Sequence, residues 1–295
     1  MNIPESNDAL QRNVSYEVNE IIENIDFDSI HDGENTVRFL VFTNNSELLN
    51  SIKSIRPAKS SDKGFPMTTG TSRNNSAFYI ATFEDGSELP VIAKRMQILE
   101  AINESRAYDA ILRSNLPSLE VLMILEDERD SGYLLTISNP HIVSLLNINQ
   151  SIKSNIQNLP NAISNGNYEA LIENIKKQIL QSTMIGFNVL ESYHNAGILH
   201  NDAFPKNILV DLVTKQTIVC DFDSSVTQDS AIDPLQSDKE RKDYIIHVVK
   251  YFTNSFKEIL EQNSESKILE ELKEILESLQ LSLLTEISKL TGINF

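Results

Sequence analysis

Three polar residues in the second half of the chain have types and a spacing that suit chemistry on a phosphate. Asp202 is followed five residues later by Asn207, and Asp221 closes the short apolar run Ile218–Cys220. Carboxylate and amide oxygens are ligands that magnesium accepts, and a carboxylate beside a hydroxyl can take its proton. The spacing predicts that Asp202 orients an acceptor hydroxyl while Asn207 and Asp221 hold the magnesium of a nucleotide.

The composition is ordinary for a globular chain. Apolar residues make up 40% and charged residues 23% of the 295 residues, enough for a substantial core in one large domain or two lobes. No apolar run approaches the roughly 20 residues that span a bilayer, and the polar, acidic N-terminus resembles neither a secretory signal nor a transit peptide. Cys220 is the only cysteine, which excludes an internal disulfide. We therefore expect no membrane association, and a cytoplasmic or other reducing intracellular location.

The net charge of −17 bears on the partners of the chain. It argues against nucleic acid, because phosphate contacts require clustered Lys and Arg. It would suit a cationic acceptor through long-range steering, although an acidic balance mostly reports solubility. The oligomeric state does not follow from the sequence.

Hydrophobic periodicity predicts strands in the first half of the chain and helices in the second. The expected strands of the first half are Val37–Phe42, Ala77–Phe83, Leu89–Met96, Val121–Leu125 and Tyr133–Ile137, with a turn at Asp32-Gly33, a loop over Lys59–Asn75 and a helix over Gln97–Ser114. The second half is expected to be helical from about His141 to Asn195 with a break near 160–167, to contain short strands at Ile208–Val210 and Ile218–Cys220, and to end in helices Lys242–Gln262 and Ser266–Leu290. We predict an α+β fold with an N-terminal extension of unclear role (1–60), a β-rich N-lobe (61–138) and a helical C-lobe with the catalytic and metal loops (139–295).

The segments Tyr193–Asp211 and Val219–Asp223 resemble the catalytic and metal-binding loops of the protein-kinase-like superfamily. That superfamily includes protein kinases and the aminoglycoside and choline phosphotransferases. The resemblance extends over about 65–260 and is most specific in the pattern HxDxxxxN, which reads HNDAFPKN here. It implies a two-lobed protein-kinase-like fold that transfers the γ-phosphoryl group of ATP, with Mg2+ as cofactor, to an acceptor hydroxyl.

The resemblance also implies roles for the residues of the predicted catalytic loop. Asp202 corresponds to the catalytic Asp, and His200 to a structural His that braces the loop. Most protein kinases carry a Lys two residues after the catalytic Asp, where this chain has Phe204. Lys206 lies where some tyrosine kinases place their basic residue, and could serve the phosphate or lie in solvent.

Three acidic positions after the catalytic loop complete the predicted C-lobe site. Asp221 and Asn207 correspond to the magnesium ligands of the superfamily. Asp223 stands where protein kinases have Gly; a second acid is familiar in small-molecule phosphotransferases and could add a metal contact. Asp243 resembles the helix Asp that braces the catalytic loop.

In the predicted N-lobe, the run Val91–Lys94 resembles the strand that supplies the ATP-contacting Lys. An ammonium facing apolar neighbours needs an anionic partner, although a side chain reaching solvent is the alternative for Lys94. The partner in the superfamily is a Glu on the next helix. Glu104 is favoured, because it shares a helix face with Tyr108, and Glu100 is the competitor.

A phosphate-covering loop is the weakest element of the resemblance. Glycines let backbone amides approach phosphates closely, but the chain has no GxGxxG. The segment Gly70–Ser76 could do this work with hydroxyl and Asn side chains, which places Gly70 among the candidate nucleotide contacts. The departure raises the chance of weak nucleotide binding.

The sequence leaves the acceptor open. The segment between Asp221 and Asp243 is short and lacks Ala-Pro-Glu, which favours a small or unusual acceptor. The limited helical material around it leaves little room for a dedicated small-molecule pocket. We therefore expect an atypical Ser/Thr protein kinase, with a small-molecule phosphotransferase and a pseudokinase binding module as alternatives.

Overall fold

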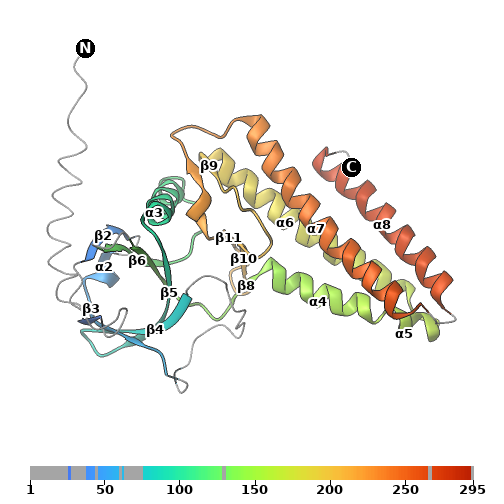
Figure 1. Cartoon of the computed structure of the whole chain (residues 1–295), viewed down its shortest axis with the longest axis horizontal. Coiled ribbons are helices and arrows are strands. Elements are labelled where there is room, and N and C mark those ends of the chain that lie inside the picture. Colours follow the sequence, from blue (N-terminus) through green and yellow to red (C-terminus); the bar gives the residue numbers. More distant parts are fainter. Residues whose placement is uncertain are drawn as a thin grey trace, which may run out of the picture. The chain divides into compact units, whose positions relative to one another are not determined.

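The computed structural model describes residues 26–27, 38–43, 46–59, 62, 76–127, 131–264 and 268–293. The chain divides into two units: unit 1 comprises Met1–Ile142 and Asp221–Thr227, and unit 2 comprises Val143–Cys220 and Gln228–Phe295. Strands are concentrated in unit 1 and long helices in unit 2 (Figure 1). The predicted α+β class with a β-rich and a helical part is confirmed. The boundaries predicted at 60 and 138 stay predictions, and the Asp32-Gly33 turn lies outside the described residues.

Unit 1 is built on a seven-stranded sheet in the order β1-β3-β4-β5-β7-β6-β2. Strand β1 pairs with β3 in parallel, and the other pairs are antiparallel. The strands are β1 (Asp26–Phe27), β2 (Arg38–Phe42), β3 (Ile52–Pro57), β4 (Ser76–Phe83), β5 (Glu88–Gln97), β6 (Val121–Asp127) and β7 (Ser131–Ile137), and the short helix α2 (Ser46–Leu49) precedes β3. Strands β4 and β5 form a hairpin whose turn lies at the predicted Glu84-Asp85-Gly86, where Gly86 adopts a φ of +81°.

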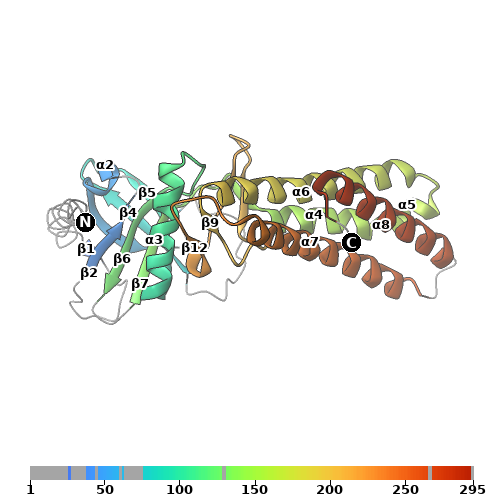
Figure 2. The ribbon, with the colours of Figure 1, turned by 90° about the horizontal axis from the view of Figure 1, so that it is seen from above.

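The hydrophobic core of unit 1 is built on this sheet, and the interior strand β6 is buried throughout Val121–Leu125. The core contains Leu49, Ile52, Ile55, Tyr79, Ala81, Phe83, Val91, Ala93, Leu122, Met123, Leu125, Tyr133 and Leu135. Helix α3 (Ile98–Arg113) packs against strands β5, β6 and β7 (Figure 2). Its approach depends on Gly132, where a Cβ atom would lie 2.5 Å from the Cβ of Ala101.

Unit 2 consists mainly of helices that run alongside one another (Figures 1 and 2). They are α4 (Leu145–Gln157), α5 (Leu159–Ser164), α6 (Glu169–Asn195), α7 (Pro234–Gln262) and α8 (Leu269–Thr291). A small sheet in the order β11-β10-β8 is formed by β8 (Ile142–Ser144), β10 (Ile208–Asp211) and β11 (Thr217–Val219). The two-residue strand β9 (Ile198–Leu199) follows α6 and leads into the predicted catalytic loop.

The central helices of unit 2 approach closely at Gly186, where a Cβ atom would lie 2.1 Å from the hydroxyl oxygen of Tyr244. Helix α7 begins at Pro234 rather than at the predicted Lys242. Pro is favoured in the first turn of a helix, and the Asp233 side chain accepts a hydrogen bond from the backbone of Leu235 at 2.9 Å. The additional helical turns include Glu240, whose carboxylate accepts hydrogen bonds from the loop described below.

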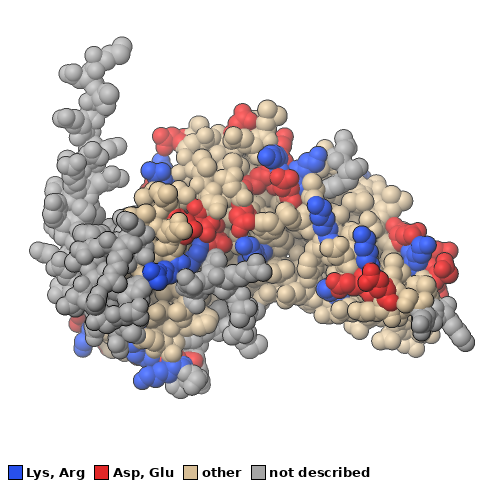
Figure 3. All heavy atoms as spheres, viewed as in Figure 1, with Lys and Arg blue, Asp and Glu red and all other residues tan. Residues whose placement is uncertain are grey.

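The exposed surface carries both signs of charge. On the face shown in Figure 3, Lys and Arg side chains are interspersed with Asp and Glu. Ion pairs join helices of unit 2, among them Lys153 with Glu258 at 2.6 Å and Lys176 with Glu286 at 2.5 Å. None of the helices in the described ranges combines the length and the apolarity that crossing a membrane requires.

Candidate functional site

The loop between β9 and β10 brings together three of the predicted site residues. The amide nitrogen of Asn207 donates to the backbone oxygen of Asp202 at 2.9 Å and to its Oδ2 at 3.0 Å. Lys206 Nζ lies 3.2 Å from the same Oδ2. Because Asn207 uses its nitrogen on Asp202, its Oδ1 is the side-chain atom left to act as a ligand. The Asp202 carboxylate remains 28% exposed, so it is held in place but accessible.

His200 fixes the start of this loop. Its Nδ1 accepts a hydrogen bond from the backbone N–H of Asp202 at 3.2 Å, and its Nε2 lies 2.8 Å from the carbonyl oxygen of Cys220. A backbone N–H can only donate and a carbonyl can only accept, so the proton is on Nε2. Cys220 also donates its N–H to the Asn207 carbonyl at 3.0 Å. The buried imidazole therefore links the backbone of the loop to Cys220, the residue before Asp221.

A buried carboxylate, Glu240 on α7, accepts hydrogen bonds from the backbone of the same loop. Its Oε1 accepts from Asn201 N at 2.5 Å, and its Oε2 lies 3.3 Å from His200 N and 2.5 Å from His194 Nε2. His194 Nδ1 in turn lies 2.7 Å from Ser237 Oγ. Burial opposes the charge of Glu240, but the hydrogen bond and charge of His194 and the N–H donors outweigh it, so its pKa lies below the ordinary value.

The prediction assigned this bracing contact to Asp243, and the structure places Glu240 there instead. Asp243 is exposed, and no hydrogen bond or ion pair joins it to the described part of the loop. Glu240 lies on the same helix stripe as the buried Tyr244, one turn on. Asp243 is rotated by about 100° from Tyr244 around the helix. The sequence could have indicated this role. A Glu on the buried face of an amphipathic helix requires hydrogen-bond donors around its carboxylate.

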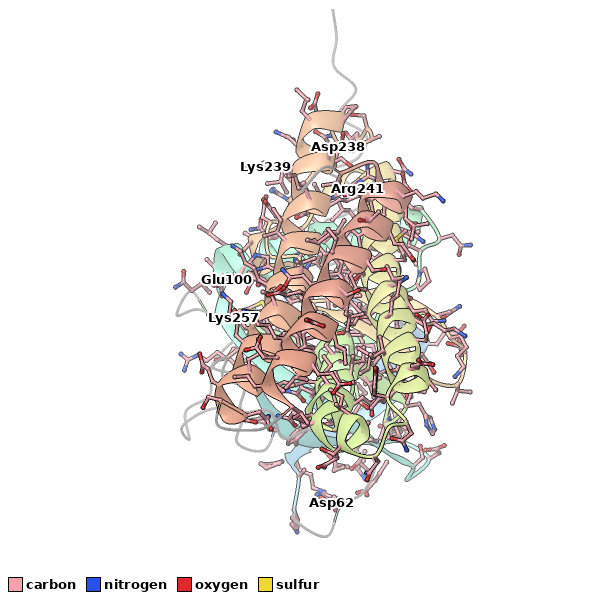
Figure 4. All side chains as sticks on the ribbon, turned by 90° about the vertical axis from the view of Figure 1, so that its right-hand side faces the viewer. Asp62, Glu100, Asp238, Lys239, Arg241 and Lys257 are labelled. Atoms are coloured by element: carbon pink, nitrogen blue, oxygen red, sulfur yellow. The ribbon has the colours of Figure 1, made fainter. Side chains whose placement is uncertain are left out.

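A cavity of about 390 Å³ lies beside Asp202, between the loop and α7. Its α7 wall is a stripe of polar side chains at helical spacing: Gln236, Lys239, Asp243 and His247. The ring of His247 packs against Phe204, with the centroids 4.2 Å apart. Lys239 and Arg241 project to opposite sides of α7 (Figure 4), and Arg241 pairs with Glu191 at 3.0 Å rather than lining the cavity. The volume is within the range of small-molecule sites.

In unit 1, Lys94 on β5 lies among three carboxylates. Its Nζ contacts Asp221 Oδ1 and lies 3.3 Å from Asp223 Oδ2 and 3.5 Å from Glu104 Oε1. The Lys94 side chain is only 13% exposed, so it does not extend into solvent as the alternative proposed. The partner on the next helix is thus Glu104. The competitor, Glu100, instead accepts the backbone N–H of Gln97 at 2.7 Å and caps the start of α3.

The burial of this cluster shifts two pKa values. Glu104 is fully buried, and desolvation raises its pKa to about 7, although the charge of Lys94 opposes the shift. Desolvation alone would lower the pKa of Lys94, but the charges of Glu104, Asp221 and Asp223 outweigh it and raise the pKa above its ordinary value. The ammonium therefore stays charged, and the cluster carries more acidic groups than basic ones.

The segment that carries Asp221 and Asp223 is a tight turn packed on α3. Asp221 adopts a left-handed conformation with a φ of +70° and a ψ of +56°, which is uncommon for a residue with a side chain. The next residue, Phe222, is fully buried and packs edge-on against Tyr108, with the ring centroids 5.5 Å apart. Asn103 of α3 donates to the Asp223 backbone oxygen at 2.8 Å. The turn is thus anchored to the same helix that supplies Glu104.

An apolar strip next to Lys94 was not identified from the sequence. Directly paired residues of antiparallel strands lie on one face, and the register pairs Ile92 with Phe78 on β4 and with Thr136 on β7. Ile92 precedes Lys94 by two residues, so its side chain lies on the same face as the ammonium. Phe78 is 38% exposed, a notable amount for Phe in mid-strand. The spacing of Ile92 and Lys94 in the sequence indicates that they share a face of β5. Their neighbour Phe78 follows only from the strand register.

Gly70, the candidate phosphate-loop residue, lies outside the described residues. In the described ranges, no group of three or more His, Cys, Asp and Glu side chains is arranged to hold a metal ion. Asp221 and Asp223 provide a pair of carboxylates rather than a closed set of ligands.

A scan against protein-family models found no match to the chain, and a search of curated proteins found none either.

The raised pKa of Glu104 predicts a pH dependence of stability. A group whose pKa rises on folding favours the folded state at low pH, and this contribution is lost as pH rises through the folded value. Between pH 4.5 and about 7, ionisation of Glu104 should lower the free energy of unfolding by up to about 3 kcal/mol. Glu104→Gln should lack this loss, so urea unfolding at several pH values should give a flatter profile. Glu100→Gln, on the same helix, should follow the wild type; parallel profiles for Glu104→Gln and wild type would refute the assignment.

The hydrogen bonds of Glu240 predict which α7 carboxylate holds the loop. Glu240→Ala removes the acceptor for two backbone N–H groups and for His194, and should lower the free energy of unfolding by about 3 kcal/mol or more. Asp243→Ala, three residues on, should change it by less than about 0.5 kcal/mol. Urea titrations of both variants measure the difference, and equal losses would contradict the assignment to Glu240.

Proposed function

We propose that this protein is an ATP-dependent phosphotransferase that moves the γ-phosphoryl group of magnesium ATP to an acceptor hydroxyl. The observation that carries the proposal is the cluster in unit 1, where Lys94 is faced by Glu104, Asp221 and Asp223. A pKa of about 7 leaves Glu104 partly protonated at neutral pH, but Asp221 and Asp223 alone already outnumber the single ammonium. A divalent cation with a nucleotide would balance the charge and give the lysine phosphate oxygens to contact.

The donor set fits magnesium bound together with a nucleotide. Magnesium is usually held in nucleotide sites by one or two carboxylates plus the phosphates and waters, rather than by a complete protein cage. Asp221 and Asp223 supply such a pair, and the role of Asn207 as a magnesium ligand stays a prediction. The bound ion would neutralise the charge of the phosphates.

The remaining residues of unit 1 suit the binding of the nucleotide. Glu104 orients Lys94, whose Nζ would donate to phosphate oxygens. Phe78 and Ile92 offer an apolar surface on the same sheet face, on which a purine could stack. In the described structure Lys94 contacts Asp221 directly, so nucleotide binding would exchange part of that ion pair for phosphate contacts.

The loop of unit 2 suits the acceptor. Asp202 would accept the hydrogen bond and then the proton of the attacking hydroxyl. Asn207 holds its carboxylate, and Lys206 offsets its charge at 3.2 Å. His200 and Glu240 fix the backbone beneath it, so catalysis would come from positioning and electrostatics.

The cavity beside Asp202 favours a small hydroxyl-bearing molecule as acceptor. Its volume of about 390 Å³ suits a small ligand, and its α7 wall offers donors and acceptors of both charges. The Ser/Thr protein kinase predicted from the sequence shares the same chemistry and remains the second candidate. A nucleotide-binding module without transfer is the third.

Transfer of labelled phosphate from γ-labelled ATP tests the proposal, with the full chain incubated alone, with proteins and with hydroxyl-bearing metabolites. Asp202→Asn should reduce transfer by at least about 100-fold while sparing ATP binding. Asp221→Asn should abolish the stabilisation by ATP that depends on magnesium. Asp85→Asn, in an exposed hairpin turn, is the matched control and should behave as wild type.

The pattern of labelling separates the candidates. Label in a metabolite supports the small-molecule acceptor, and label in protein supports the protein kinase. Magnesium-dependent binding without transfer to any acceptor would support the binding module. Full activity of Asp202→Asn would refute the role of Asp202.

A further inference from the structure

The side chain of Asn103 makes one hydrogen bond to the turn that carries the two acids. Its Nδ2 lies 2.8 Å from the backbone oxygen of Asp223, and the contact is partly buried. A carbonyl oxygen can only accept, so the NH2 end of the amide must face it. The orientation of Asn103 is thus set by chemistry, and it joins α3 to the turn.

The turn makes hydrogen bonds within itself and also accepts this one from α3. The carbonyl of Phe222 accepts both the backbone N–H of Ser225 at 3.0 Å and its hydroxyl at 2.7 Å. The next carbonyl, that of Asp223, takes its donor from α3 instead. The turn starts at Asp221 in a left-handed conformation that is sparsely populated for residues with a side chain. The turn thus begins in a left-handed conformation and takes one hydrogen bond from a residue outside it, Asn103.

The carboxylate of Asp223 depends on the same backbone. Its Oδ1 accepts from Ser224 Oγ at 3.1 Å, and its Oδ2 lies 3.3 Å from Lys94 Nζ. Lys94 is in turn 3.5 Å from Glu104, which follows Asn103 in the chain. Consecutive residues of α3 therefore hold the backbone of the turn and the lysine that faces it. Neighbouring helix positions point about 100° apart, which lets each reach a different target.

We infer that Asn103 is a positioning residue: its amide fixes the Asp223 backbone and so keeps the Asp223 carboxylate beside Lys94 and Asp221. Asn103 touches no nucleotide in this scheme and acts through the turn. The effect on magnesium rests on the proposed function, whereas the effect on the turn does not.

Three variants separate the hydrogen bond from simple packing. Asn103→Leu keeps a similar volume and removes the donor. Asn103→Gln keeps the amide group on a stem that is one methylene longer. Ser105→Ala is the matched control, because the Ser105 hydroxyl, on the same helix, donates within the helix to the Ile102 carbonyl at 2.8 Å.

Backbone-amide hydrogen exchange of the segment 221–227 is the first readout, measured on the free protein. Loss of one hydrogen bond should speed exchange there by roughly two- to tenfold in Asn103→Leu. Asn103→Gln should restore much of the protection, and Ser105→Ala should match the wild type. Wild-type exchange in Asn103→Leu would overturn the inference, and so would equal acceleration in Ser105→Ala.

Thermal stabilisation by ATP over a magnesium titration is the second readout. Asn103→Leu should need roughly two- to tenfold more magnesium for half of the effect, with partial rescue in Asn103→Gln. An unchanged magnesium requirement alongside faster exchange would overturn the link from the turn to the cation. If the wild type itself shows no stabilisation by magnesium ATP, the proposed function fails, and the exchange comparison still decides the role of Asn103 in the turn.

Discussion

The burial of a single ammonium group, that of Lys94, constrains the arrangement of unit 1. An ammonium removed from water is costly unless carboxylates surround it, and the side chain is only 13% exposed. Strand β5 sets its position, α3 brings Glu104 to it, and the turn at Asp221 completes the cluster. Three acids for one base exceed what neutralisation of Lys94 requires. The excess is the physical reason to assign the cluster to a cation and a phosphate ligand.

The loop of unit 2 is subject to a similar constraint: its backbone N–H groups, like the Lys94 ammonium, need hydrogen-bond acceptors. A sharp loop that presents an accessible carboxylate leaves amides without helix or sheet partners. The buried carboxylate of Glu240 accepts two of them, and the His200 ring accepts a third, from Asp202. Asp202 lines the cavity, and Asn207 and Lys206 hold its Oδ2. Rigidity beneath a reactive group is what catalysis by positioning needs.

Local signals in the sequence located most of the elements, and tertiary pairing explains what they missed. Short apolar runs between turn residues placed β4 to β7, and in the HxDxxxxN segment Asn207 donates to Asp202. The start of α7 was missed because Asp233-Pro234 was not taken as a helix start. Glu240 was passed over because Asp243 matched the superfamily pattern. The contact of Asn103 depends on how α3 lies against the turn, and Phe78 on strand register, neither of which a local pattern encodes.

Titration calorimetry of the full chain with ATP shows whether the Lys94 cluster binds magnesium ATP. Binding should require magnesium and should weaken at least about tenfold when Lys94→Met removes the ammonium. Lys206→Met, which removes a more exposed lysine of the other unit, should weaken binding less. Binding that is the same with and without magnesium, or that is unchanged in Lys94→Met, would contradict the account.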